Sequence, residues 1–358
     1  MNARTAVRAL LAAAALALAA AGAALAQAPP AVSTYWKTRA EKTNYRQTAD
    51  YDETVRYAKQ IEAGSRWVSV QSFGKSGQGR DLWLVVLSKE RAFTPAAARA
   101  TGKPIVLVNC GIHSGEIEGK DAALALMRDV AATRSRAELL DSAIVLVVPI
   151  LSVDAHERRG RFNRINQNGP EEMGWRTTPT GLNLNRDWLK GESPEMRALL
   201  ANVYTKWWPH LLIDTHTTDG ADYRYDLTYG IQHGAGVPAA IDRWMADAFE
   251  GRVVARAEAL GHLVGPYMSF RRGNDPASGI DFGNAPPRFS TAYPVLHNRP
   301  AILVETHMLK PYDVRVRATY DLLLVVLEEL RARPRALTRA VSVAAEETIA
   351  RGREASPA

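Results

Sequence analysis

Short apolar runs alternate along the chain with longer segments in which apolar residues recur at helical spacing. The apolar runs predict strands at residues 67–71, 81–88, 105–109, 143–151, 211–214 and 301–305. The longer segments predict helices at residues 54–63, 120–132, 194–206, 238–260 and 315–331. Strands that are apolar along their full length and separated by helices are typical of a parallel sheet covered on both faces. The pattern therefore predicts an α/β fold with a mixed, mostly parallel central sheet and helices on both faces.

The N-terminal residues follow a different pattern. Arg4 and Arg8 precede an almost pure Ala and Leu run at residues 9–21, and Ala24-Leu25-Ala26 has the small-x-small form of a cleavage site. These features predict a signal peptide at residues 1–26, cleaved after Ala26, and a secreted or periplasmic protein. A membrane anchor is the alternative, but the run is short and rich in alanine. No other stretch is apolar and long enough to span a membrane.

The remaining chain shows no internal repeat and no long Gly/Ser linker. We expect an N-terminal extension at residues 27–45, a single domain at residues 46–332 and a basic C-terminal tail at residues 333–358. A chain of 358 residues, less the predicted signal peptide, is long enough for one large α/β domain with ample core.

Charge and cysteine content exclude several classes of function. Residues 1–26 hold two arginines and no acid, so their removal lowers the formal net charge from +7 to +5. The basic residues are scattered and do not alternate with aromatic residues, so we expect no nucleic-acid partner. The single cysteine, Cys110, excludes an intramolecular disulfide and is expected to be a small buried apolar residue. A serine hydrolase is disfavoured because no Gly-x-Ser-x-Gly elbow follows a strand.

Polar residues follow three of the predicted core strands. His113 and Glu116 come after residues 105–108, His216 follows residues 211–213, and Glu305 follows residues 301–304. In open α/β sheets ligands bind at the carboxyl ends of the strands, so we expect these side chains to converge there. Imidazole and carboxylate groups suit a divalent ion such as zinc, and the pattern therefore indicates a metal site.

Taken in order, these residues and their neighbours resemble the zinc carboxypeptidase (metallocarboxypeptidase) family. The resemblance runs from Tyr51 to Leu330. It begins with the Gly-x-Ser-x-x-Gly-Arg turn at residues 74–80. It continues through His113-x-x-Glu116, Leu184-Asn185-Arg186-Asp187 and His216, and it ends with Glu305. The resemblance implies that residues 46–332 form a zinc carboxypeptidase-like catalytic domain.

The resemblance also implies roles for the residues at the strand ends. His113, Glu116 and His216 would bind one Zn²⁺ per chain and leave a fourth position for water. Glu305 matches the family's general base. Competing third ligands are His210 and His156, which fit the resemblance less well, and His307 is expected to support the site or the fold without binding the metal.

The resemblance assigns the substrate contacts to a second group of residues. Asn185 and Arg186 match the pair that holds the substrate's terminal carboxylate, for which a guanidinium is well suited. Arg176 is expected to stabilise the oxyanion, with Arg164 as a competitor. Ile280 resembles the floor of the specificity pocket, where an apolar residue would favour apolar C-terminal side chains.

One position departs from the family pattern. In well-known members a tyrosine precedes the Ala-Ser-Gly of the loop over the pocket by two positions, but here that place is Asp275, and Ala277 begins the Ala-Ser-Gly. Tyr267 and Tyr293 are possible substitutes, although neither has the family spacing. The way in which the substrate carboxylate is capped, and the choice of substrate, therefore stay open.

The sequence predicts an exported zinc metallopeptidase that removes C-terminal residues from a peptide or protein with a free C-terminus. An alternative is a zinc amidohydrolase acting on peptidoglycan stem peptides or N-acylated amino acids, which substrate profiling would distinguish. A third hypothesis is a non-catalytic binding protein on the same scaffold. It is disfavoured because all three metal-ligand positions, the base and the carboxylate-binding pair are occupied by the expected residue types.

Overall fold

The computed structural model of the protein describes residues 32–355. The chain divides after Trp36 into two units, and the described part of the first unit carries the short helix η1 (Thr34–Trp36). The predicted signal peptide and its cleavage site lie outside the described residues. Across residues 32–355, no helix has both the length and the apolar character needed to cross a membrane.

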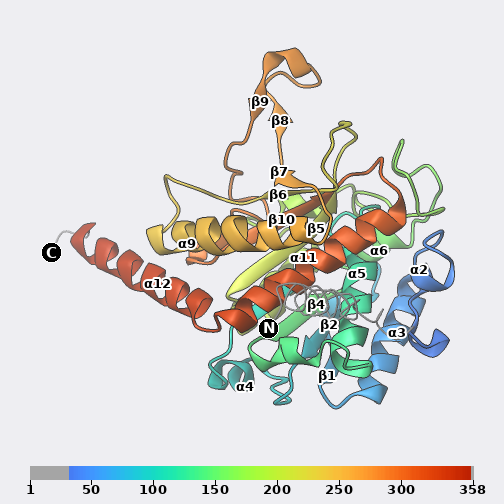
Figure 1. The fold of residues 1–358 in the computed structure, drawn as a ribbon, viewed down its shortest axis with the longest axis horizontal. Coiled ribbons are helices and arrows are strands. Elements are labelled where there is room, and N and C mark those ends of the chain that lie inside the picture. The colour runs from blue at the N-terminus through green and yellow to red at the C-terminus, as the bar shows by residue number, and fades with distance from the viewer. Residues whose placement is uncertain (1–31, 356–358) are drawn as a thin grey trace, which may run out of the picture. The chain divides into compact units, whose positions relative to one another are not determined.

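The second unit, from Lys37 onward, alternates strands and helices along the chain (Figure 1). Its strands are β1 (Val68–Lys75), β2 (Asp81–Leu87), β3 (Ile105–Asn109), β4 (Ile144–Val148), β5 (Leu211–Thr217), β6 (Leu227–Gly230), β7 (Val264–Pro266), β8 (Ser269–Phe270), β9 (Ile280–Asp281) and β10 (Ala301–Thr306). Its helices are α2 (Arg39–Lys42), α3 (Tyr51–Gly64), α4 (Pro95–Ala100), α5 (Glu118–Met127), η2 (Arg128–Ala132), η3 (Ala137–Asp141), α6 (Val153–His156), η4 (Leu184–Arg186), α7 (Pro194–Ala198), η5 (Leu199–Tyr204), α8 (Thr205–Trp207), α9 (Ala239–Trp244), η6 (Met245–Val254), α10 (Ala255–Ala259), η7 (Pro276–Ser278), η8 (Pro294–His297), α11 (Tyr312–Ala332) and α12 (Ala336–Ala355).

Within the described residues the main sheet has eight strands in the order β1-β2-β4-β3-β5-β10-β6-β7. The four central strands β4, β3, β5 and β10 are parallel to one another. Antiparallel pairings join this group to β2 on one side and to β6 on the other. The predicted mixed, mostly parallel sheet is thus confirmed. After β3 the chain forms β4 on one side of β3 and then crosses to form β5 on the other side. Such a switch point is where α/β sheets bind ligands.

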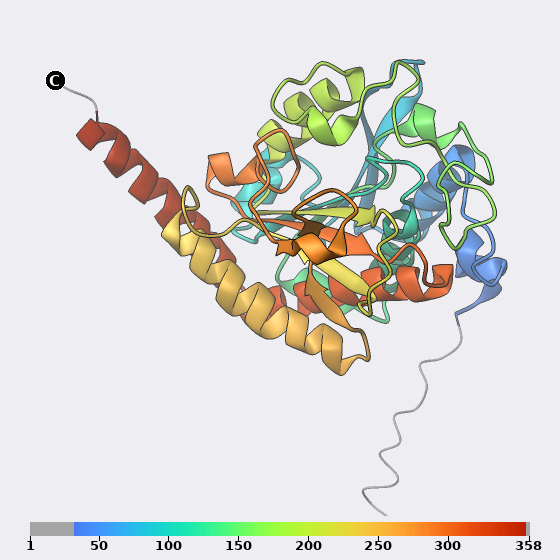
Figure 2. The ribbon, with the colours of Figure 1, turned by 90° about the horizontal axis from the view of Figure 1, so that it is seen from above.

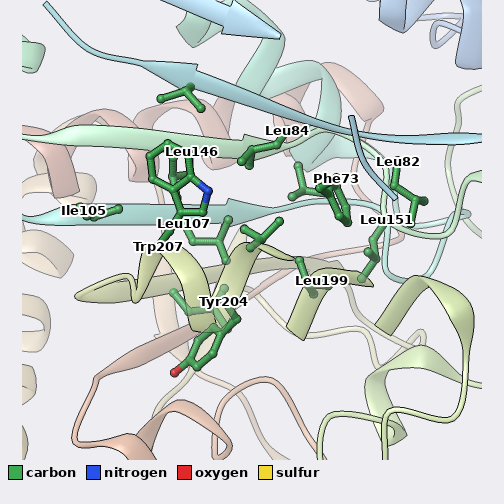
Figure 3. Packing of buried hydrophobic residues seen from close by; sticks show 14 of the residues in the cluster. Phe73, Leu82, Leu84, Ile105, Leu107, Leu146, Leu151, Leu199, Tyr204 and Trp207 are labelled. Carbon is green, nitrogen blue, oxygen red and sulfur yellow. The ribbon is translucent and has the colours of Figure 1, made fainter. Parts of the chain in front are cut away.

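The core explains why the central strands are apolar along their full length. Ile105 and Leu107 point to one face of β3, where they pack in a cluster that includes Leu199, Tyr204 and Trp207 of the helix beginning at α7 (Figure 3). The intervening strand residues point to the other face, toward α5 and α11, which pack against each other there (Figure 1). Because both faces of the sheet are covered by helices, alternation of apolar and polar residues is lost.

Local signals determine where the longer helices begin. The Asp50 side chain accepts a hydrogen bond from the Glu53 N–H at the start of α3, and Ser193 does the same for Met196 at the start of α7. Pro194, at the first turn of α7, has a backbone angle already suited to a helix. The helices predicted at residues 194–206 and 238–260 are each continuous in the structure, with π-helical segments η5 and η6 in their middle.

The edge of the sheet and the C-terminal region hold elements that the sequence pattern did not predict. β6 and β7 extend the sheet beyond β10, and β8 pairs with β9 in a separate hairpin (Figure 1). Residues 336–355 of the predicted basic tail form α12, which lies beside α9 (Figure 2). Leu337, Val341 and Ala344 of α12 are buried, so this helix has an apolar face that packs.

Candidate metal centre and active site

His113 and Glu116 lie in the turn that follows β3. Gly111 allows the chain to leave the strand because its φ of +64° is one that side chains with a Cβ rarely adopt. The following helix α5 packs closely on β5, since a Cβ on Gly119 would overlap the Thr215 side chain. This contact places Glu116, just before α5, next to the end of β5 and thus next to His216.

His216 and Glu305 lie on neighbouring core strands. They are directly paired in the parallel register of β5 and β10, so their Cα atoms are partners across the two strands. Both side chains are buried, with 4% of His216 and 8% of Glu305 exposed. The strand pairing therefore places a carboxyl group beside the histidine without any contribution from loops.

The structure brings His113, Glu116 and His216 together as the sequence predicts. Donor atoms of the three side chains all lie within 4.8 Å of one another, and within residues 32–355 this is the one such group that can hold a metal ion. The Nδ1 atom of His216 lies 2.8 Å from Glu116 Oε2, and that of His113 lies 3.1 Å from Glu116 Oε1. His113 Nδ1 is nevertheless a buried atom without a hydrogen bond of good geometry.

The electrostatics of the cluster fit a divalent cation. Burial opposes ionisation of Glu116, but Arg164 and the two imidazoles outweigh burial and hold the pKa of Glu116 well below its usual range. Burial would also lower the pKa of His216, yet Asp214 and Glu116 raise it well above its usual range. A site that stabilises a proton so strongly between carboxylates can stabilise a metal ion in its place. Burial lowers the pKa of His113, which keeps its imidazole in the neutral form that ligates metals.

The predicted competitors for the third ligand lie elsewhere. His210 precedes β5, at the opposite end of that strand from His216, and its Nδ1 accepts a hydrogen bond from Ile105 N–H. His156 lies in α6 and contacts Glu157 and Lys120. His307 is buried and lies edge-on against the Tyr223 ring. None of these three histidines is in the cluster of metal-binding donors found within the described residues.

A cavity of about 510 Å³ opens at the cluster. Besides the three clustered side chains, the predicted residues Arg176, Asn185, Arg186 and Glu305 line it. Burial raises the pKa of Glu305 above its usual value, although His216 opposes that shift. The lining also includes residues to which the sequence assigned no individual role, from β6 and the residues after it, from β7, and from the segment between β7 and β10: Tyr229, Gly230, Ile231, Gln232, His233, Pro266, Ser269, Asp281, Phe282, Gly283, Asn284, Ala285, Pro286 and Phe289.

The two candidate arginines have different surroundings. Arg164 Nη1 lies 2.5 Å from Glu116 Oε1, and its Nη2 donates to the carbonyl oxygens of Thr217 and Thr218. Only 7% of the Arg164 side chain is exposed, compared with 35% of Arg176. Arg176 Nη1 also donates to Glu116 Oε1, at 2.7 Å, but Arg176 lines the cavity. Arg164 is therefore tied to the end of β5, whereas Arg176 faces the space a substrate would occupy.

Asn185 and Arg186 lie in the short helix η4. Asn185 Oδ1 accepts a hydrogen bond from Ser290 N–H, and Arg186 Nη1 donates to the Asn185 carbonyl. The Arg186 guanidinium lies 4.0 Å from the centre of the Phe289 ring, which restricts its motion. The guanidinium retains free N–H donors for a carboxylate.

Two expectations about the outer loop have different outcomes. Ile280 lies in β9, where it pairs with Phe270 and is 42% exposed, and the residues described as lining the cavity do not include it. Tyr267 does line the cavity, and the nearby Glu305 carboxylate and burial together raise its pKa. Tyr293, the other possible substitute, packs against Trp188 and Tyr204 in the core. Asp275 caps η7 by accepting from Ala277 N–H.

Sequence reasoning did not assign roles to two residues that contact the clustered histidines. Asp214 Oδ2 lies 2.7 Å from His216 Nε2, and Asn183 Oδ1 lies 2.8 Å from His113 Nε2. Both precede an assigned residue by two positions, a spacing that was visible in the sequence. Cys110, in contrast, is buried as expected, and burial raises the pKa of its thiol to about 12.

The match to a known protein family covers the region that contains the three clustered side chains. Residues 54–216 match the family model described as zinc carboxypeptidase. A zinc carboxypeptidase from Saccharothrix mutabilis subsp. capreolus is 27% identical over 147 residues, which cover 39% of this chain and 32% of that protein. The alignment therefore spans about a third of that relative's length.

Solved structures share the fold at low sequence identity. A metallo-carboxypeptidase from Pseudomonas aeruginosa, in complex with (2-guanidinoethylmercapto)succinic acid, has a TM-score of 0.56 at 18% identity, over 81% of this chain and 70% of its own. Carboxypeptidase A from Helicoverpa armigera has a TM-score of 0.55 at 15% identity, over 95% of this chain and 82% of its own. A metallo-carboxypeptidase from Burkholderia cenocepacia has a TM-score of 0.56 at 14% identity, over 79% of this chain and 69% of its own. These similarities concern the fold.

Proposed function

We propose that this chain, whose residues 54–216 match the zinc carboxypeptidase family model, is a zinc metallopeptidase that hydrolyses C-terminal peptide bonds. The observation that carries the proposal is the position of His113, Glu116 and His216 at one end of a cavity. The same cavity is lined by a buried carboxyl group and by two arginines. Peptide hydrolysis at a free C-terminus requires groups of these kinds.

The metal-binding part of the proposal rests on the donor set. His113, Glu116 and His216 would hold one zinc ion, since two imidazoles and a carboxylate with an open position are typical of catalytic zinc. A zinc ion bound there would acidify a water molecule and polarise the carbonyl of the scissile bond. The buried, hydrogen-bond-deficient Nδ1 of His113 fits this role because it has a lone pair and no other partner of good geometry.

The chain's own residues would then perform the proton transfer and hold the substrate. Glu305 accepts the proton of the attacking water and passes it to the nitrogen of the departing amine as the C–N bond breaks. Arg176 donates to the carbonyl oxygen as negative charge develops on it. Asn185 and Arg186 bind the terminal carboxylate, so the last peptide bond is the one that reaches the metal centre.

The test is metal content together with release of C-terminal amino acids from a mixed peptide library. We expect one zinc per chain and release that stops with a chelator and returns when zinc is added. Peptides with an amidated C-terminus serve as the control and should be poor substrates. Release that continues in protein free of metal would contradict the proposal.

The alternative substrate class uses the same groups on a different amide. Asp275, at the place where well-known family members have a tyrosine, caps η7, so this position offers no tyrosine hydroxyl to the substrate. Peptidoglycan stem peptides and N-acylated amino acids belong in the same assay. Zinc-dependent cleavage of those compounds without cleavage of ordinary peptides would favour the alternative, and zinc binding without any cleavage would favour a binding protein.

We also propose that the protein acts outside the cytoplasm. The support is the sequence of residues 1–26, with its basic start, apolar run and small-x-small site. Mass spectrometry of the protein recovered from its native host tests this directly. We expect a mature N-terminus at Gln27, and recovery of a chain that begins at Met1 from the cytoplasm would contradict it.

A further inference from the structure

The two histidines of the metal cluster are oriented in the same way but are held by different groups. In each imidazole Nδ1 faces Glu116 and Nε2 faces away from it. His216 Nε2 is 2.7 Å from a carboxylate oxygen of Asp214, whereas His113 Nε2 is 2.8 Å from the amide oxygen of Asn183. One histidine thus contacts a charged acceptor and the other contacts a neutral one.

Both acceptors determine which nitrogen carries the proton. A carboxylate and an amide oxygen only accept, so Nε2 of each imidazole carries an N–H, and a metal bound beside Glu116 would take the place of any proton on Nδ1. The Asn185 amide nitrogen is also 3.3 Å from His216 Nε2, but it is a donor, so it does not compete for the proton that Asp214 accepts. Both Nδ1 atoms are therefore available to a metal.

The position of Asp214 is fixed by the sheet. Asp214 and His216 are two residues apart on β5, so their side chains share one face of the strand. Asn109, the register partner of Asp214 on β3, donates its side-chain N–H to Asp214 Oδ1 at 2.8 Å. Asp214 is 1% exposed and Asn109 is fully buried. The carboxylate is thus held from two neighbouring strands and cannot turn away from the imidazole.

Asn183 is held more loosely and serves a second purpose. It is partly exposed, and its side-chain oxygen also accepts the Asn185 N–H at the start of η4. Its amide oxygen carries no formal charge, so it orients the His113 ring without adding the electron donation of a carboxylate. A carboxylate that accepts from a metal-bound histidine makes that histidine a more basic and stronger ligand.

On this geometry, and resting on the zinc function proposed above, we infer that Asp214 is a positioning residue that makes His216 the stronger of the two histidine ligands. Asn183 orients His113 without strengthening it. Metal affinity therefore depends on the carboxylate of Asp214 more than on the amide of Asn183.

The test is zinc affinity of the full chain, measured by competition with a chelator of known affinity, for wild type and three variants. Asp214→Asn keeps an oxygen acceptor but removes the charge, and we expect zinc binding about 10–100-fold weaker. Asn183→Asp adds a carboxylate behind His113 and is expected to bind zinc at least as tightly as wild type. The double variant moves the carboxylate from one histidine to the other and should recover most of the lost affinity.

Two further measurements separate positioning from damage to the fold. Thermal unfolding of the metal-free proteins shows whether Asp214→Asn is folded, and the visible absorption of the cobalt-substituted proteins reports the coordination geometry. If Asp214→Asn does not fold, Asn183→Asp still decides, because weaker zinc binding in that folded variant would overturn the inference. Wild-type affinity in a folded Asp214→Asn protein would also overturn it. Failure of the wild-type chain itself to bind zinc would instead remove the proposed function.

Discussion

The cavity has a metal end and an outer wall that are built in different ways. The metal end, formed by His113, Glu116, His216 and Glu305, comes from the ends of β3, β5 and β10 and from the turn after β3. The outer wall, formed by the lining residues between 266 and 289, comes from short strands and loops between β7 and β10. The metal end is buried, whereas Phe282 of the outer wall is 59% exposed.

This difference suits the metal end to the chemical step and the outer wall to the choice of substrate. His216 and Glu305 are fixed by strand pairing and Glu116 by several hydrogen bonds, and catalysis depends on such fixed geometry. The outer wall has few buried contacts, and exposed loops of this kind tolerate sequence change and determine which ligand is accepted. Substitutions at the metal end should therefore abolish binding or turnover, and substitutions in the outer wall should change preference only.

The largest effect is expected from removal of a proposed metal ligand. His216→Ala should bind no zinc at the concentration where wild type binds one, and its activity should fall by more than the ~10²–10⁴-fold that a general base contributes. Mass spectrometric metal analysis measures this. His210→Ala, at the other end of the same strand, is the matched control and should retain zinc. Full zinc occupancy in His216→Ala would remove this residue from the metal end.

The next largest effect is expected from a change that removes the proposed general base and leaves the metal site unchanged. Glu305→Gln keeps the shape of the side chain but cannot accept a proton, so we expect full zinc content and kcat lower by about 10²–10⁴-fold. Steady-state kinetics on one peptide, with zinc measured in the same sample, provides the comparison. Turnover within a few-fold of wild type would mean that another group accepts the proton from water.

The metal end could be predicted from sequence because its chemistry coincides with the strongest local pattern. Apolar strands that are buried on both faces are easy to recognise, and the predicted positions of β3 and β10 agree with the structure to within one residue. The residues after those strands then had to meet, because parallel strands bring their carboxyl ends to one edge. Asn185 and Arg186 were found by family resemblance and not by pattern.

The outer wall could not be predicted because its position depends on tertiary contacts. β6 and β7 have four and three residues, and β8 and β9 have two each, too few to show a period in the sequence. Ile280 was placed in the pocket by resemblance, but the structure has it on β9, while its neighbours Asp281 and Phe282 line the cavity. A shift of one residue along a strand reverses the direction of a side chain, and no local signal fixes it here.

A smaller effect is expected where the metal end meets the substrate carboxylate. Arg186→Ala should raise KM for peptides with a free C-terminus by about 10–100-fold, the value of a hydrogen bond to a charged group, and change kcat less. The KM for amidated peptides should rise much less, since these peptides have no carboxylate to bind. Arg186→Lys keeps the charge but not the planar pair of donors, so its KM should lie between those of wild type and Arg186→Ala. An equal loss on both kinds of peptide would contradict carboxylate binding.

The smallest effect should come from the outer wall. Phe282→Ala removes an exposed ring that lines the cavity, so we expect the ratio of kcat/KM for large and small apolar C-terminal residues to change by less than about tenfold. Zinc content and thermal stability should stay at wild-type values, because Phe282 is exposed, lies outside the core and is not one of the proposed ligands. Leu296→Ala, which is exposed on η8 and outside the cavity lining described above, is the control and should leave the ratio unchanged. Loss of zinc in Phe282→Ala would show that the outer wall supports the metal end, and the separation of chemistry from selection would then be wrong.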